Sequence, residues 1–328
     1  MMFAPLMRQL LRGRRPPALV DEGELPYHDV PRLTSAMTET SRELRDRGYV
    51  DYPVFVHLET LAICNAACSF CPYPTLDRKG VKMPDATVEK VINDLTVIPP
   101  HFLFRFAPYK VSDPFLEPRL FDIIELAESK LSNMRVTLIT NGSALTERKI
   151  EELKKVKRVN YLTVSLNFDD EEEYERVMQL SFRRTLERLD MLHKKVAAKE
   201  LAFPVRVSRV SGGRQDDESF LRFVRARYPA FPVYVVPRND WIGEVVTEGA
   251  LNEVPDAPCH RWFDLSITAT GDVAMCCMDG RTQYSHGNVN NEHALKIYNH
   301  PTLRALRKNL ASRRATGAPC DRCTYLAS

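Results

Sequence analysis

The chain has 328 residues, of which 44% are hydrophobic, and its 46 basic and 43 acidic residues give a formal net charge of +3. This composition supports one large globular domain or two modest ones, and the balanced charge excludes a global field that would indicate nucleic acid as a partner. No apolar run approaches the ~20 residues that span a bilayer, and the first residues make a poor secretory signal, so we expect a cytoplasmic protein without a membrane partner.

Residues 1–50 are interpreted as an N-terminal extension. From residue 54 onward, short β-branched or aromatic runs alternate with longer amphipathic stretches, which is typical of βα units around a parallel sheet. Six strands are predicted, at residues 54–59, 102–109, 135–140, 161–167, 203–210 and 231–237. The predicted helices between them include residues 85–95, 121–131, 146–156, 171–196 and 218–228. Residues 51–240 are therefore expected to form one partial α/β barrel.

Three cysteines, Cys64, Cys68 and Cys71, follow the first predicted strand in the run CNAACSFC. In a chain without a secretory signal, cysteines indicate metal ligands or reactive thiols rather than disulfides. A cubic 4Fe-4S cluster is normally held by four thiolates, so this trio either takes a distant fourth ligand or leaves one iron open to a small molecule. A zinc site or three buried free thiols is the alternative.

The CxxxCxxC run, with Phe70 before its third cysteine and Tyr73 shortly after it, resembles the radical S-adenosylmethionine (radical SAM) superfamily. The resemblance implies a 4Fe-4S cluster whose open iron is chelated by the amino and carboxylate groups of SAM. It also implies a partial (β/α)6 barrel. In βα barrels the catalytic groups emerge from the C-terminal ends of the strands, where this cysteine loop is expected.

Polar residues after the second and fourth predicted strands extend this resemblance. Ser112 and Asp113 align with the Gly-Gly-Glu-Pro stretch of the family, although both glycines are absent and Asp replaces Glu. Asp113 is expected either to receive the SAM amino group or to cap the helix that follows. Ser165 and Asn167 end the fourth strand, where family members place side chains against the SAM ribose and carboxylate.

Two arginines on the fifth predicted strand, Arg206 and Arg209, are expected to share a face. They are candidates for binding the SAM carboxylate or an anionic substrate, with surface ion pairs as the alternative. Four residues after the sixth strand are candidates for substrate contact at the barrel mouth, with a polar inter-domain loop as the alternative: Arg238, Asn239, Asp240 and Trp241.

Residues 241–328 are predicted to form a second, smaller module with a β hairpin around Gly271 and a helix over residues 292–311. Its cysteine spacing is similar to that of the shortened SPASM module called a twitch domain, which implies one auxiliary 4Fe-4S cluster. The chain ends five residues after the last cysteine, which leaves a second auxiliary cluster without ligands. Four thiolates of this kind can saturate either zinc or such a cluster, and the candidates are Cys259, Cys276, Cys320 and Cys323.

Cys277 is the one cysteine of this module that is not among the four candidate ligands. Adjacent strand residues point to opposite faces, so Cys276 and Cys277 cannot both easily serve one cluster, and the glycine spacing of the module assigns Cys276. Cys277 is either buried like a small apolar residue or donates a hydrogen atom to a substrate radical.

The resemblance implies that SAM is cleaved to a 5′-deoxyadenosyl radical, which takes hydrogen from an unactivated carbon. We predict a small-molecule substrate, a sugar or aminocyclitol-like metabolite, that is oxidised to a ketone while the auxiliary cluster accepts an electron. The alternatives are epimerisation with Cys277 as hydrogen donor, maturation of a ribosomally made peptide, and a non-catalytic metal-binding interaction protein. An electron donor such as flavodoxin or ferredoxin is the expected protein partner.

Overall fold

The computed structural model describes residues 30–246 and 254–325. In these residues the strands form one sheet in the order β6-β5-β4-β3-β2-β1-β7-β8, parallel throughout except for the antiparallel β7–β8 pair. The strands are β1 (Phe55–Leu58), β2 (Phe104–Ala107), β3 (Met134–Thr140), β4 (Val159–Ser165), β5 (Val205–Val210), β6 (Val233–Val236), β7 (Asp264–Ile267) and β8 (Val273–Ala274).

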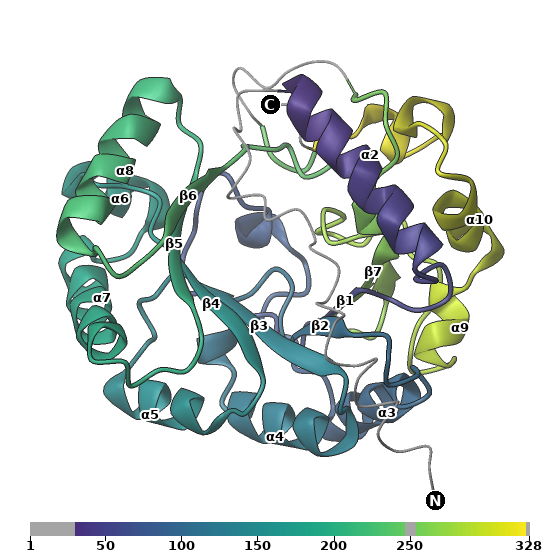
Figure 1. Ribbon diagram of the computed structural model, residues 1–328, viewed down its shortest axis with the longest axis horizontal. Coiled ribbons are helices and arrows are strands. Elements are labelled where there is room, and N and C mark those ends of the chain that lie inside the picture. Colours follow the sequence, from purple (N-terminus) through teal and green to yellow (C-terminus); the bar gives the residue numbers. More distant parts are fainter. Residues whose placement is uncertain (1–29, 247–253, 326–328) are drawn as a thin grey trace, which may run out of the picture.

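Helices surround the curved sheet on its outer side (Figure 1). The helices of the barrel are α3 (Asp85–Leu95), α4 (Leu120–Lys130), α5 (Glu147–Lys155), α6 (Glu171–Met178), α7 (Phe182–Ala197) and α8 (Arg214–Arg227). The others are α2 (Val30–Asp46), α9 (Ala294–Tyr298) and α10 (Pro301–Asn309). This is the predicted partial α/β barrel, and none of the described helices is both long and apolar enough to cross a membrane.

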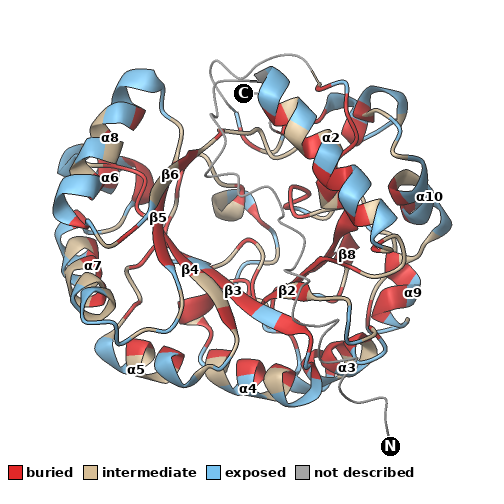
Figure 2. Cartoon of the chain, in the orientation of Figure 1, coloured by how far each residue is buried: buried red, intermediate tan, exposed pale blue. Residues whose placement is uncertain are grey.

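Apolar spacing explains how the helices pack. In α3, Val88, Val91, Ile92 and Leu95 recur at intervals of three and four residues, and each is at most 2% exposed. Figure 2 shows the same division in the ring of helices, with buried residues facing the strands and exposed residues facing solvent. Because helices cover their outer face, most strand residues are buried, although Arg135 and Ile139 of β3 are exposed.

Two stretches that were each predicted as one helix are in fact two helices. Residues 171–196 divide into α6 and α7 because Gln179 adopts a left-handed conformation (φ 54°) and Ser181 caps α7 by accepting from the Arg184 amide. Residues 292–311 divide into α9 and α10 because Pro301, the first residue of α10, cannot continue the preceding helix.

The C-terminal hairpin continues the barrel sheet. β7 pairs in parallel with β1, with Phe55 opposite Asp264, and β8 then returns antiparallel to β7. The turn between them requires Gly271 for two reasons. Its φ of 89° is a conformation that other residues rarely adopt, and a side chain at this position would clash with Asn290. Helix α2, in the segment interpreted as an extension, packs against α10 and the 3-10 helix η3 (His260–Phe263). Residues 1–29 of that segment lie outside the described residues.

Candidate active site

A cavity of about 950 Å³ occupies the barrel interior. Residues near strand starts, such as Phe55 and Pro232, line it, and so do residues beyond strand ends, such as Asp113 and Asn239. Its volume is near the upper end for small-molecule sites. It brings together most of the predicted site residues, namely Cys64, Cys68, Phe70, Cys71, Tyr73, Ser112, Asp113, Ser165, Asn167, Arg206, Asn239, Trp241 and Cys277.

The cysteine loop is held at the C-terminal ends of the strands by contacts with distant segments. The Cys64 sulfur accepts from the Asn141 side chain at 3.8 Å, and Asn141 directly follows β3. The Cys68 sulfur lies 3.2 Å from the Met178 sulfur at the end of α6. These contacts place all three thiols of the loop on the cavity wall.

The environment of these thiols fits a thiolate-bound metal cluster. Burial raises the pKa of Cys64 to about 11 and that of Cys71 to about 12, and it also raises the pKa of Cys68. Coulombic repulsion from the neighbouring thiolates raises the pKa of Cys68 further. A bound cation would favour the thiolate form of all three cysteines. Three soft sulfur donors in one short loop suit iron in a cluster.

Asp113 joins the ends of two strands. Its carboxylate accepts from the Phe115 amide at 3.0 Å, which caps the 3-10 helix η2 (Pro114–Leu116). It also accepts from the Thr140 hydroxyl at 2.7 Å and the Asn141 amide at 2.9 Å. The expected capping role is therefore present. Beside it, the buried Ser112 hydroxyl has no hydrogen-bond partner among the described residues, which leaves it available to a ligand.

Asn167 has a similar structural role at the end of β4. Its side chain donates to the Ser165 hydroxyl at 3.0 Å and accepts from the Val210 amide at 2.9 Å. Its φ of 67° is a left-handed conformation that asparagine tolerates better than most residues. Ser165 and Asn167 thus face the cavity in one fixed arrangement.

The expectation that Arg206 and Arg209 share a face is wrong. Side chains alternate along a strand, so positions three apart point to opposite faces. Arg206 lines the cavity, with its guanidinium 3.7 Å from the Tyr161 ring centroid. Arg209 lies on the outer face of β5, 1% exposed, where its Nε donates to Asp217 of α8 at 2.7 Å. We therefore remove Arg209 from the candidate SAM and substrate contacts.

Only two of the four candidate substrate contacts at the barrel mouth line the cavity. Asn239 and Trp241 line the cavity, and the Trp241 indole donates to the carbonyl of Phe70 in the cysteine loop at 3.0 Å. Asp240 is not on the cavity wall and instead accepts from Thr324 at 3.1 Å, and Arg238 is also outside the lining. The loop after β6 therefore contacts both the cysteine loop and the C-terminal segment.

A second, small buried cavity lies among four cysteines, Cys259, Cys276, Cys320 and Cys323. The Trp262 indole donates to the Cys320 sulfur at 3.4 Å. Burial raises the pKa of all four thiols, so here too ionised sulfurs need a bound cation. Four converging thiols fit the predicted second metal centre.

The adjacent residues Cys276 and Cys277 lie on different cavities. They follow β8, which ends at Ala274, in a bend and a turn, so the expected strand alternation is not the reason for their separation. Cys277 lines the barrel cavity. Its sulfur, a ring nitrogen of His57 and a carboxylate oxygen of Asp264 all lie within 4.8 Å of one another. The His57 Nε2 is 4.0 Å from the Asp264 carboxylate. Sequence reasoning missed His57 and Asp264, because only the β1–β7 pairing brings them together.

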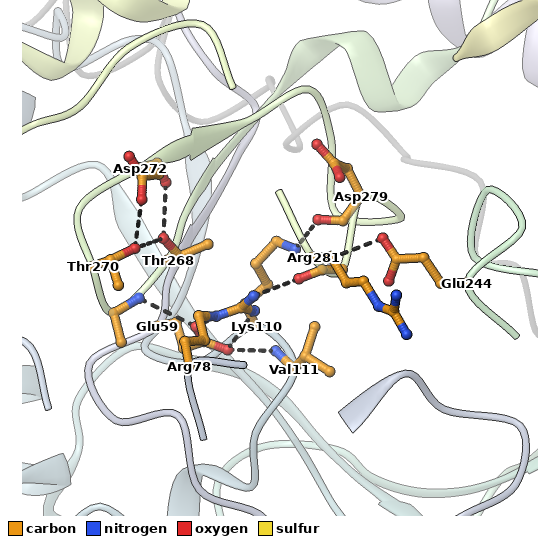
Figure 3. Close-up of polar contacts among 12 residues, drawn as sticks. Glu59, Arg78, Lys110, Val111, Glu244, Thr268, Thr270, Asp272, Asp279 and Arg281 are labelled. Carbon is orange, nitrogen blue, oxygen red and sulfur yellow. Dashed lines mark hydrogen bonds and ion pairs between the residues drawn. The ribbon is translucent and has the colours of Figure 1, made fainter. Parts of the chain in front are cut away.

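A buried ion pair connects the barrel, the segment after the cysteine loop and the C-terminal region (Figure 3). Glu59, 0% exposed, directly follows β1 and pairs with Arg78 at 2.6 Å. The Glu59 carboxylate also accepts from the Ala269 and Val111 amides. Arg78 in turn donates to the Gly280 carbonyl at 2.6 Å. These contacts fix three segments of the chain relative to one another, and one of them includes Val111 of the cavity wall.

We expect Glu59→Gln to lower the free energy of unfolding by about 3–5 kcal/mol, because it leaves the buried Arg78 charge without its counter-ion. Chemical denaturation with circular dichroism measures this change. Glu187→Gln is the matched control, because its pair with Arg183 is exposed and is worth less than ~1 kcal/mol. Equal effects of the two substitutions would contradict the proposed importance of the buried pair.

The fold and the site define a class of protein, an α/β barrel with a group of cysteine thiols at the C-terminal ends of the strands. The model of the radical SAM superfamily matches residues 58–225, just over half of the chain, and that of an iron-sulfur cluster-binding domain, SPASM, matches residues 259–324. The chain belongs to the radical SAM superfamily. Membership and the SPASM match imply SAM and 4Fe-4S clusters as its cofactors.

Three solved structures are similar in fold. BtrN in complex with AdoMet and 2-DOIA is 16% identical, with 82% of this chain and 92% of that chain covered and a TM-score of 0.56. Streptococcus suis SuiB bound to the precursor peptide SuiA is 13% identical, with 98% and 80% covered and a TM-score of 0.63. The protein anSMEcpe with bound AdoMet is 13% identical, with 80% of each chain covered and a TM-score of 0.58.

Proposed function

We propose that this protein is a radical SAM dehydrogenase that oxidises an alcohol carbon of a small polar metabolite to a ketone. The observation that carries the proposal is the common wall between the two cavities: Arg261, Met278 and Tyr325 line both the barrel cavity and the four-cysteine site. An electron leaving a substrate in the barrel would cross one layer of side chains. The similar fold of BtrN, solved with AdoMet and 2-DOIA, supports a small-molecule substrate.

The cofactors, when bound, supply a 5′-deoxyadenosyl radical and a one-electron acceptor. In this proposal the trio of Cys64, Cys68 and Cys71 holds the SAM-binding cluster. The C-terminal set holds the auxiliary cluster, and its members are Cys259, Cys276, Cys320 and Cys323. SAM is contacted by the polar and aromatic residues on the adjoining cavity wall, which are Phe70, Tyr73, Ser112, Asp113, Ser165, Asn167 and Arg206. Asn239 and Trp241 contact the substrate.

Oxidation of the alcohol removes a hydrogen atom from carbon, a proton from oxygen and one electron. The hydrogen atom goes to the deoxyadenosyl radical and the electron to the auxiliary cluster, so the proton needs an acceptor. His57 lines the cavity. Burial and the positive charges of Arg261, Arg105 and Lys110 lower the pKa of His57 well below its usual value, so its imidazole is neutral near pH 7. The same burial and positive charges oppose protonation of His57, so we propose that the proton passes to solvent water rather than to this imidazole.

The test begins with anaerobically prepared protein, SAM and a flavodoxin or ferredoxin reducing system. We expect 5′-deoxyadenosine to form, and a panel of sugars and aminocyclitols to contain compounds that increase its rate and yield one ketone for each 5′-deoxyadenosine. A peptide that stimulates the reaction while no metabolite does would favour peptide maturation, for which the SuiB structure with its precursor peptide is the relevant comparison. Absence of 5′-deoxyadenosine under all conditions would favour a non-catalytic metal-binding protein.

A second candidate function, epimerisation, is favoured by the position of Cys277 on the barrel cavity. As a hydrogen-atom donor, its thiol would return hydrogen to the substrate carbon without net oxidation of the substrate, and the thiyl radical left on sulfur would take one electron from the flavodoxin or ferredoxin system and one proton from solvent. The two functions differ in deuterated water. For the dehydrogenase we expect Cys277→Ala to retain ketone formation, with no deuterium at the reacting carbon. Deuterium at that carbon in the wild-type product, lost in Cys277→Ala, would instead establish epimerisation.

A further inference from the structure

Two arginines lie side by side near the strand starts in the barrel interior. Arg105 and Arg135 are the second residues of β2 and β3, and they are partners in the register of those strands. Both line the cavity. Neighbouring strands are about 4.8 Å apart, so the two guanidinium groups project from adjacent positions on the same face. Like charges so placed repel each other unless an anion lies between them.

No carboxylate in residues 30–246 or 254–325 forms an ion pair with either arginine. Arg105 donates to the Tyr161 hydroxyl at 3.1 Å and stacks on the Phe55 ring at 4.1 Å from its centroid. Its Nε is buried and has no hydrogen-bond partner within the part of the chain that the structure describes. Arg135 is an exposed residue of β3, and its side chain faces the same cavity. The protein thus holds two positive charges in place without neutralising them.

The rest of the wall has the same sign. Among the described residues that line the cavity, Asp113 is the one acidic residue, and its oxygens already accept three hydrogen bonds. The basic lining residues are Arg105, Lys110, Arg135, Arg206 and Arg261, of which Arg261 pairs with Asp264 at 3.3 Å. A ligand that enters this space meets a field that favours anions.

We propose that Arg105 and Arg135 bind a phosphate group, and that the substrate of the proposed dehydrogenase is a phosphate ester. A phosphate monoester carries close to two negative charges near pH 7 and presents three acceptor oxygens, which match two guanidinium forks. A single carboxylate would leave one of the two charges unpaired. The binding site follows from the geometry alone, whereas its role in substrate choice rests on the proposed function.

The position of this site constrains the shape of the ligand. Arg135 is five residues before Thr140, the residue that contacts Asp113 beside the cysteine loop. At about 3.3 Å per residue this separation is about 16 Å along the strand. The phosphate would therefore lie toward the strand starts, and the carbon that reacts would lie at the opposite end of the substrate, near the cysteine loop.

Binding of inorganic phosphate to the full, cluster-loaded chain tests the site directly by titration calorimetry at constant ionic strength. We expect R105Q and R135Q each to weaken phosphate binding by about tenfold or more, because each removes charge-assisted hydrogen bonds. R183Q is the matched control and should bind like the wild type, because Arg183 is an exposed residue of α7. Acetate, the carboxylate probe, should bind at least about tenfold more weakly than phosphate.

Unchanged phosphate binding in R135Q would overturn the site, and this substitution at an exposed position avoids a fold defect, which circular dichroism checks. Acetate binding equal to phosphate binding would overturn the phosphate assignment. Formation of 5′-deoxyadenosine without added substrate is measured on the same samples. If 5′-deoxyadenosine forms but phosphate does not bind, only the proposed anion site is contradicted. If phosphate binds but SAM is never cleaved, only the proposed function is contradicted. Stimulation of SAM cleavage by a sugar but not by its phosphate ester would overturn the substrate class.

Discussion

Replacement of Cys68 by alanine is expected to abolish the formation of 5′-deoxyadenosine. A cluster held by three protein thiolates loses its attachment when one is removed, and SAM then has no iron to bind. The iron content should fall from about eight to about four atoms per chain, since a cubic cluster contains four. Iron and acid-labile sulfide analysis of anaerobically prepared protein, together with chromatography of the SAM products, measures both effects.

Ser69→Ala is the matched control for this substitution. Ser69 lies in the same loop, beside Cys68, but it is exposed. It should keep both the iron content and the formation of 5′-deoxyadenosine. If Cys68→Ala retained about eight irons and cleaved SAM at the wild-type rate, the assignment of the loop as the SAM-binding cluster would be wrong.

Replacement of Cys320 by alanine should have a different result, in which SAM is still cleaved but the ketone is lost. The four-cysteine site would lose its cluster and about four irons would remain, all bound to the cysteine loop. The deoxyadenosyl radical would still take hydrogen from the substrate, but the substrate radical would lack its electron acceptor. Product analysis should therefore show 5′-deoxyadenosine with little or no ketone.

The exposed Arg322 lies between Cys320 and Cys323 and provides the control. Arg322→Gln should retain about eight irons and form ketone at the wild-type rate. A Cys320→Ala protein that lost the cluster yet formed ketone normally would show that the auxiliary site is not the electron acceptor. Zinc in place of iron at this site in the wild type would lead to the same conclusion.

The local pattern of the sequence was sufficient to predict the barrel. All six strands predicted between residues 54 and 237 are present, because runs of β-branched and aromatic residues favour extended backbone. The helix breaks at Gln179 and Pro301 were missed, although Pro301 and the capping residue Ser181 are visible in the sequence. In both places the apolar spacing continues across the break, so periodicity alone does not reveal it.

Several site residues could not be assigned without the tertiary structure. The same-face expectation for Arg206 and Arg209 failed because it ignored the two-residue alternation of a strand. Arg105 did leave a signal, since it is a charged residue inside the otherwise apolar run FLFRFA. Its neighbour Arg135, however, is recognisable only from the register of β2 and β3.

The sequence by itself determined the chemistry that depends on short spacing: the CxxxCxxC loop, the terminal pair of cysteines and the order of strands and helices. The tertiary structure decided which distant residues meet. The pairing of β1 with β7 brings His57 to Asp264, and the turn after β8 directs Cys276 and Cys277 to different cavities. The physical reason is that ligand spacing within a loop is set by local chain geometry, whereas contacts across a sheet depend on register and packing of the whole fold.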